Sequence, residues 1–213
     1  LVAKAPWSDE AVLAAVRAQV LPGMTRRQPV VAWIVDNTAI PKKGRHSVGV
    51  ARQYCGQLGK QENCQVAVTL SVATWQASLP VAYRLYLPRE WAEDRARRKK
   101  AGVPEEVQFQ TKPEIALDQI RQAVAAELPR GVVLADAGYG SDTRFREGLS
   151  ALGLSYVVGV LGTTSVWGPG MGPLPAPASR PHGPPAQAVA AQPDAPPGFG
   201  ARCTAPDFLD SFF

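Results

Sequence analysis

Apolar residues follow two different periods along the first three quarters of the chain. The continuous apolar run at 30–35 is typical of a strand buried on both faces. The runs at 66–72 and 79–87 alternate apolar residues with polar or smaller ones, and the turn between them predicts a hairpin. Short apolar runs at 132–135 and 156–161 predict two further strands.

Capping residues and apolar faces of helical period predict three helices. Ser8 is a suitable N-cap for a helix that runs to about residue 20, with acidic residues in its first turn. Thr111 and Glu114 have the spacing of a capping box, with a proline between them. Ser141 or Asp142 caps a third helix. After the first helix the order is β β β α β α β, which predicts an α/β fold with a mixed five-stranded sheet and flanking helices.

Proline use separates a C-terminal segment from this domain. Eleven of the 20 prolines fall between positions 168 and 213, where neither period is present. Ordering the backbone costs about 1–2 kcal/mol per residue, which a segment with little apolar surface cannot offset. We therefore expect the end of an N-terminal helical region at 1–24, a folded domain at 25–164, and a disordered Pro/Ala/Gly-rich tail at 165–213.

Composition narrows the possible classes of protein. No apolar run reaches the roughly 20 residues that a membrane helix needs, which argues against a membrane protein. Three cysteines without a CxxC pair favour reduced thiols in a cytoplasm and argue against structural zinc. Because the chain starts at Leu1 without a signal-peptide pattern, we expect a piece of a longer protein.

The positive charge is concentrated in the predicted domain. Residues 1–164 hold 21 Lys and Arg against 15 Asp and Glu, whereas residues 165–213 hold two against three. A basic domain can bind a polyanion such as DNA, although a solvated basic surface explains the same count.

Two aspartates each follow a predicted buried strand. Asp36 comes directly after the run at 30–35, and Asp136 comes directly after the run at 132–135. If these strands are parallel neighbours, both side chains open into one crevice at the carboxyl edge of the sheet, where ligands bind. Two carboxylates about 4 Å apart repel by roughly 4 kcal/mol at an effective dielectric of 20, and Mg²⁺ or Mn²⁺ commonly relieves such repulsion. The alternative is that each aspartate only caps a turn.

Basic residues surround the first aspartate and make a phosphodiester substrate the favoured interpretation. The connection after it carries five of them, and a second basic run lies at 95–100. The five candidate DNA contacts are Lys42, Lys43, Arg45, Arg52 and Lys60.

Five segments together resemble the DDE transposases of bacterial insertion sequences. They are IVDNTAIPKKG, SVGVARQYCGQLGKQENCQVAV, LYLPREW, GVPEEVQFQTKPEIAL and LADAGYG, and the resemblance runs from about residue 7 to 161. It implies an RNase H-like catalytic domain that cuts and joins DNA with Mg²⁺ or Mn²⁺. Asp36 and Asp136 match the first two catalytic and metal-binding aspartates. The implied partners are transposon ends, target DNA and a possible homo-oligomer.

Three departures from the family pattern bear on activity. Asn37 stands where an acid is expected in relatives, the third acid has no match, and the tail does not resemble the family segment in its place. The tail offers only Asp194, Asp207 and Asp210, none of them on a predicted helix. We therefore expect a truncated or frameshifted fragment with little activity of its own. The alternatives are a non-catalytic remnant that binds DNA or a partner, and an unrelated metal-dependent phosphohydrolase.

Overall fold

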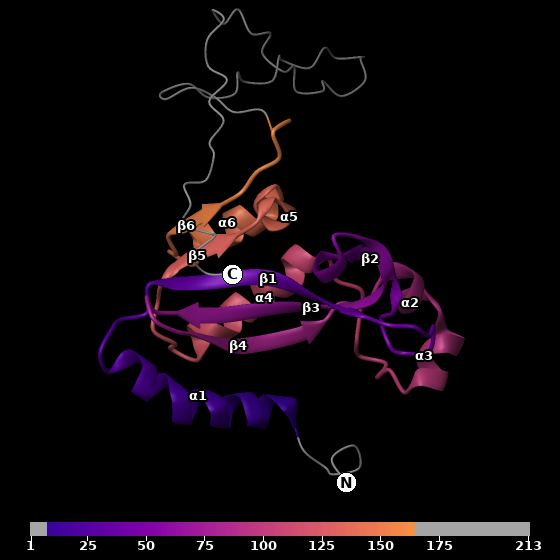
Figure 1. Ribbon diagram of the computed structural model, residues 1–213, viewed down its shortest axis with the longest axis horizontal. Helices are drawn as coiled ribbons and strands as arrows, with labels where there is room; N and C mark the ends of the chain where they lie inside the picture. Colours follow the sequence, from indigo (N-terminus) through magenta and orange to yellow (C-terminus); the bar gives the residue numbers. More distant parts are fainter. Residues whose placement is uncertain (1–7, 165–213) are drawn as a thin grey trace, which may run out of the picture. The chain divides into compact units, whose positions relative to one another are not determined.

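The computed structural model describes residues 8–164, which form one mixed sheet of six strands with flanking helices (Figure 1). The chain divides into two units at Leu161, and every described helix and strand belongs to the first, Leu1–Leu161. The predicted α/β class is confirmed, and the order β β β α β α β expected of an RNase H-like fold is present with additions. The predicted disordered tail lies outside the described residues.

Two long antiparallel strands form the centre of the sheet. β1 (Ala32–Pro41) pairs along its whole length with β3 (Lys60–Ala73), and β3 forms the predicted hairpin with β4 (Ser78–Leu85). On its other side β1 pairs in parallel with β5 (Val132–Ala135), which pairs in parallel with β6 (Tyr156–Val158). The switch from antiparallel to parallel pairing occurs where crossover helices enter the chain, as predicted.

The prediction of five strands was wrong by one. β2 (Ala51–Cys55) pairs antiparallel with the first residues of β3, and Gly59 makes the turn between them with a φ of 62°. The strand escaped prediction because Arg52 and Tyr54 point into solvent, so that it has no apolar alternation. Two of the candidate DNA contacts, Arg52 and Lys60, consequently lie on strands and not in a loop.

The helices begin where their caps predict. α1 (Asp9–Thr25) is capped by Ser8 and extends beyond the predicted end, through Pro22. α4 (Lys112–Ala125) starts with the predicted capping box, and α6 (Thr143–Ala151) is capped by Asp142. The short helices α2 (Arg89–Glu93), α3 (Arg95–Ala101) and α5 (Ala137–Gly140) were not predicted.

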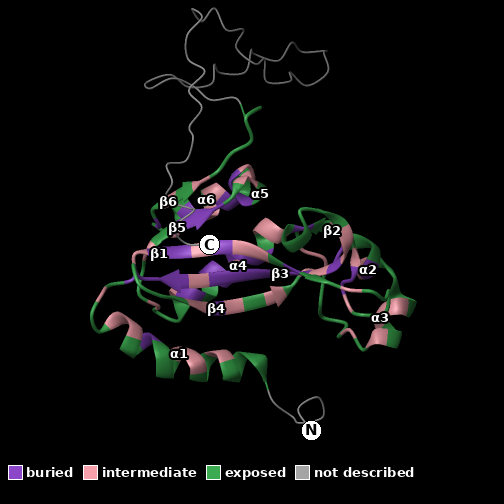
Figure 2. Cartoon of the chain, viewed as in Figure 1, coloured by how far each residue is buried: buried purple, intermediate pink, exposed green. Residues whose placement is uncertain are grey.

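Apolar clusters of buried residues hold these elements together, and a small one formed by Ala39, Cys55, Cys64 and Val66 joins β1, β2 and β3. The main cluster lies along β1, β3, α4 and α6, where Figure 2 shows buried residues interspersed with partly buried ones on the central strands; Trp33 is fully buried in it. A smaller cluster consists of Val50, Leu87 and Trp91. No helix within residues 8–164 has the length and apolar character needed to cross a membrane.

Candidate active site

Asp36 and Asp136 occupy equivalent positions on neighbouring parallel strands. The last register pair of β1 and β5 is Val35 with Ala135, and each aspartate is the next residue. Neighbouring strands lie about 4.8 Å apart. The two aspartates therefore lie next to each other, one residue beyond the end of the parallel pairing. Asp36 does not end its strand as expected, because β3 continues to pair with β1 as far as Pro41.

Both carboxylates are held by backbone N–H groups through one oxygen. Asp36 Oδ1 accepts a hydrogen bond from the Asn37 N–H at 2.6 Å, and Asp136 Oδ1 accepts one from the Gly138 N–H at 2.8 Å. The second bond makes Asp136 the N-cap of α5. Within residues 8–164 the Oδ2 atom of each aspartate has no hydrogen bond or ion pair. One oxygen of each side chain is therefore available to an external ligand.

The electrostatics of the pair favour a cation. Burial raises the pKa of Asp36, the Asn37 N–H opposes this shift, and the negative charge of Asp136 adds to it. Asp136 itself is exposed. A divalent cation between the two carboxylates would offset both the burial and the repulsion, and hard carboxylate oxygens suit Mg²⁺ or Mn²⁺. The residues present therefore fit such an ion, with two protein ligands.

A buried tyrosine links the helix that follows Asp136 to the strand that carries Asp36. The Tyr139 hydroxyl, on α5, donates a hydrogen bond to Asn37 Oδ1 on β1 at 2.7 Å. Burial raises the pKa of Tyr139, and the charges of Asp136 and Asp36 raise it further, so the hydroxyl stays protonated and donates. Sequence analysis missed this residue, although it lies three positions after Asp136. Its hydroxyl also engages the side-chain oxygen of Asn37, the residue that stands where an acid is expected in relatives.

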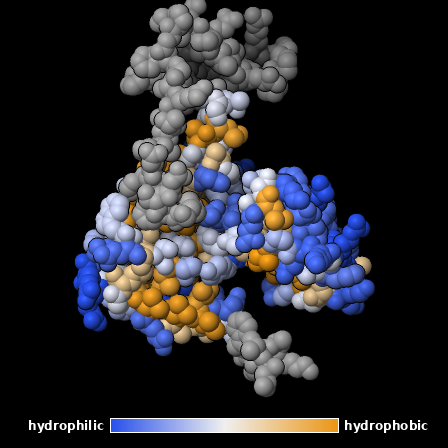
Figure 3. All heavy atoms as spheres, in the orientation of Figure 1, coloured by the Kyte–Doolittle hydropathy of each residue, from blue (hydrophilic) through white to orange (hydrophobic). Residues whose placement is uncertain are grey.

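The basic residues gather on a second part of the domain, which we call the basic lobe: the 42–50 loop, β2, α2 and α3. The lobe has a strongly hydrophilic surface in Figure 3. Arg97 on α3 donates a hydrogen bond to the Arg45 carbonyl at 2.9 Å and so joins the two basic runs. The Asn63 side chain donates to the carbonyls of Lys42 and Gly44 and fixes the turn.

Not every basic side chain of the lobe is available to a ligand. Arg98 donates to four backbone carbonyls between Ala92 and Val107, which is a structural role. Lys60 forms an exposed ion pair with Glu62 at 3.3 Å. Lys43, Arg45 and Arg52 have exposed side chains, and Lys42 is half-buried. The available charge of the candidate contacts is therefore mainly in the loop.

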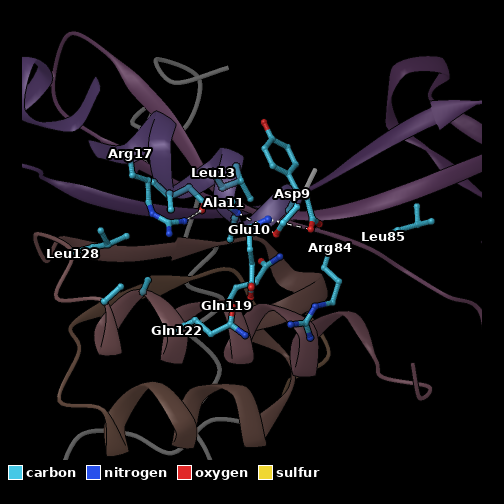
Figure 4. A pocket seen from close by; sticks show the side chains of 17 residues that line it. Asp9, Glu10, Ala11, Leu13, Arg17, Arg84, Leu85, Gln119, Gln122 and Leu128 are labelled. Carbon is cyan, nitrogen blue, oxygen red and sulfur yellow. Dashed lines mark hydrogen bonds between the residues drawn. The ribbon is translucent and has the colours of Figure 1, made fainter. Parts of the chain in front are cut away.

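No group of three or more His, Cys, Asp or Glu side chains suited to a metal ion occurs within residues 8–164. A cavity of about 770 Å³ lies elsewhere, between α1, β4 and α4, and contains neither aspartate (Figure 4). The aspartate pair lies instead one residue beyond the last paired residues of β1 and β5, two interior strands of the sheet.

Comparisons with known proteins point to one family. The family model described as DDE superfamily endonuclease matches residues 1–198, which extends beyond Leu161. A probable transposase for insertion sequence element IS701 from Microchaete diplosiphon is 34% identical over 156 residues. That match covers 73% of this chain and 38% of the relative, so the chain spans well under half of the relative's length.

A cryo-EM structure of a piggyBac transposase synaptic complex with hairpin DNA is also similar. The likeness covers 74% of this chain and 31% of that chain, at 12% sequence identity and a TM-score of 0.38. The assignment of the chain to a family therefore rests on the two sequence matches and not on this structural likeness.

Proposed function

Because the chain belongs to the DDE superfamily endonucleases, we propose that it is the catalytic domain of a DNA transposase, with Asp36 and Asp136 as metal ligands. The observation that carries this proposal is the shared register of the two aspartates at the end of the β1–β5 pairing. The Oδ2 atoms without partners and the raised pKa of Asp36 support it. The proposed partners are transposon ends and target DNA, and the proposed location is the cytoplasm.

Different residues of the chain have different roles in the proposed reaction. Mg²⁺ or Mn²⁺, when bound, supplies the activation of the attacking hydroxyl and the stabilisation of the leaving oxygen. Asp36 and Asp136 hold the ion, and Tyr139 with Asn37 fixes the relative position of their strands. Lys42, Lys43, Arg45 and Arg52 contact phosphates of the DNA backbone, and Lys60 does so once its exposed ion pair with Glu62 opens.

We further propose that this chain alone cleaves DNA poorly. Two carboxylates hold a divalent ion weakly, whereas a two-metal site normally needs at least three acids to offset and position its charges. The test is nicking of supercoiled plasmid with Mn²⁺ by the wild-type chain and by Asp136→Asn. Equal background from both supports the proposal. Nicking that is lost in the variant would mean that a third ligand exists outside the described residues.

Metal binding tests the two aspartates separately from DNA cleavage, which needs further ligands. We expect Mn²⁺ titrations followed by EPR to show weak binding to the wild-type chain, and we expect Asp36→Asn and Asp136→Asn each to abolish it. Binding that persists in both variants would contradict the site. The variants are well matched, because Asn fits the space of Asp and is also a good N-cap at position 136.

DNA binding by the basic lobe is expected to be sequence-tolerant and sensitive to salt. Each phosphate contact contributes about −0.9 to the slope of log K against log salt concentration. Replacing Lys42, Lys43 and Arg45 with Ala should flatten that slope in fluorescence anisotropy with duplex DNA. An unchanged slope would exclude a role of these side chains in binding the backbone. If the chain binds DNA but no metal ion, that result favours the alternative of a non-catalytic remnant.

A further inference from the structure

An exposed tyrosine lies among the cations of the basic lobe. Tyr54, on β2, is 59% exposed, and Arg52, two positions before it on the same face of the strand, is exposed too. Gln53 between them is turned to the other face, where its side chain donates to the Cys64 carbonyl at 3.0 Å. The tyrosine ring therefore lies in solvent beside a positive charge and belongs to none of the apolar clusters described above.

Strand pairing joins this tyrosine to the basic loop that follows β1. Arg52 lies opposite Asn63 in the β2–β3 pairing, and directly opposed residues leave the same face of a sheet. The Asn63 side chain donates to the Lys42 carbonyl at 2.6 Å, and the Asn63 carbonyl accepts the Lys42 N–H at 2.9 Å. Lys42 and Arg52 thus lie on either side of Asn63. Tyr54 and its opposite residue Gln61, which is exposed, form the next row on this face.

The acidic residue of this hairpin faces the other way. Glu62 lies opposite Gln53, on the face of the sheet that does not carry Tyr54. Its carboxylate pairs with Lys60 at 3.3 Å. Among the residues of the β2–β3 pairing, the face with the tyrosine therefore carries a cation and amides but no carboxylate.

We propose that Tyr54 stacks on an unpaired base of the DNA, while Arg52 and Lys42 contact phosphates of the same strand. This inference rests on the proposed function and names the form of DNA that the lobe binds, a strand with an unpaired nucleotide. Cations alone follow the backbone of any DNA, whereas an aromatic ring among them adds a contact that only an unstacked base can make. Every base has a flat π surface, so the contact tolerates any sequence.

The test compares Tyr54→Thr and Tyr54→Phe with the wild-type chain by fluorescence anisotropy at several salt concentrations. The probes are a labelled single strand, the same strand in a duplex, and an abasic strand that has phosphates but no bases. Thr suits a strand but has no ring, whereas Phe keeps the ring. Tyr54→Thr should bind the single strand about tenfold more weakly, with an unchanged slope of log K against log salt concentration. Its binding to the duplex and the abasic strand, and all binding by Tyr54→Phe, should equal the wild type.

Two further variants separate the ring from its position and from the charge. Tyr83→Thr is the matched control, because Tyr83 is 49% exposed on β4 and the arginine after it, Arg84, is paired with Asp118 at 3.5 Å. This variant should bind all three probes as the wild type does. Arg52→Gln removes a charge and keeps the ring, so it should weaken binding to all three probes and reduce the salt slope by about 0.9.

Photocrosslinking gives an answer that needs no variant. A single strand that contains iodouracil should form an adduct with Tyr54 of the wild-type chain, identified by mass spectrometry. Adducts at other residues only would contradict the stacking contact.

The inference can fail without the proposed function. Wild-type affinity of Tyr54→Thr for the single strand, or an equal loss on the abasic strand or the duplex, would overturn it. Mn²⁺ binding by the aspartates and duplex binding by the basic loop would still stand in that case. A wild-type chain that binds neither Mn²⁺ nor DNA would refute the proposed function and this inference together.

Discussion

We call the end of the β1–β5 pairing, which carries Asp36 and Asp136, the aspartate edge. Different kinds of contact hold the aspartate edge and the basic lobe in place. At the aspartate edge, the parallel register of β1 and β5 sets the two residues side by side, and adjacent backbone N–H groups orient their carboxylates. In the basic lobe, side chains from distant segments hold the loops. The carboxylates at the edge are therefore oriented by adjacent backbone N–H groups, whereas the shape of the lobe depends on side-chain contacts between distant segments.

Trp91 is the centre of the lobe. It is fully buried between Val50 and Leu87, its indole N–H donates to the Val50 carbonyl at 2.7 Å, and the Arg97 guanidinium lies 3.7 Å from the centroid of its ring. One side chain thus connects the start of β2, the end of β4 and α3. The comparison predicts that damage to this residue affects the lobe more than the aspartate edge.

The largest effect is expected for Trp91→Ala, which should lower the free energy of unfolding by about 3–5 kcal/mol in chemical denaturation, as is usual for a large buried aromatic residue. Hydrogen exchange followed by mass spectrometry should show lost protection in β2 and α3. Protection in β1 and β5 should fall less, since these strands pack in the main apolar cluster and Trp91 does not.

Trp75→Ala is the matched control for this substitution. Trp75 is 61% exposed in the turn between β3 and β4, so its replacement should change the free energy of unfolding far less. Equal loss of protection in β5 and in α3 on Trp91→Ala would show that the lobe and the edge unfold as one unit, and the comparison between them would fail.

A smaller effect is expected for Tyr139→Phe, which removes a side-chain hydrogen bond between β1 and α5 but keeps the ring beside Phe145, at 5.9 Å between centroids. The loss of the hydrogen bond to Asn37 should cost about 1 kcal/mol of unfolding free energy. Because the link positions both metal ligands, Mn²⁺ affinity measured by EPR should fall about tenfold.

The control for the tyrosine is Tyr156→Phe. Tyr156, on β6, shares a hydrogen bond with Ser150 at 3.4 Å, away from both aspartates. We expect a similar or smaller loss of stability and no change in Mn²⁺ affinity. If Tyr139→Phe left Mn²⁺ affinity at the wild-type level, the tyrosine would stabilise the fold without positioning the ligands.

The contrast between short-range signals and contacts of distant segments also explains which elements the sequence could predict. The apolar runs predicted the five strands of the main cluster, and the capping box at Thr111 and Glu114 predicted the start of α4, because these signals lie within a few residues of each other. β2 was missed because it lies on β3 with polar residues facing solvent. Trp91 could not be assigned, since its burial depends on Val50, 41 positions away.

For the candidate site, the sequence predicted that Asp36 and Asp136 each follow an apolar run, and the register of β1 and β5 places them next to each other. Their role as metal ligands stays a prediction. The roles of Tyr139 and Asn63 depend on contacts with other elements, such as the bond from Tyr139 to Asn37 across 102 positions. No periodicity in the sequence reports such contacts.

The smallest effect, and the only one of opposite sign, is expected for Asp36→Asn. The pKa of Asp36 is raised in the fold, chiefly by burial and also by Asp136, above its ordinary value of 3.8. The folded protein therefore binds this proton more tightly than the unfolded chain does, and its contribution to stability is complete below pH 3.8. That contribution is lost as the pH rises through the folded pKa, so ionised Asp36 destabilises the fold at pH 7.

Asn at position 36 can still accept the Asn37 N–H but carries no charge, so Asp36→Asn should be the more stable protein at pH 7 in EDTA. The gain should be smaller than the loss for Tyr139→Phe and should vanish toward pH 3. Mn²⁺ should reverse the order, because only the wild-type chain gains stability from binding the ion. Denaturation at several pH values measures both effects. A difference that did not depend on pH would mean that the charge of Asp36 is not what destabilises the edge, and the case for a carboxylate pair that needs a cation would lose its electrostatic basis.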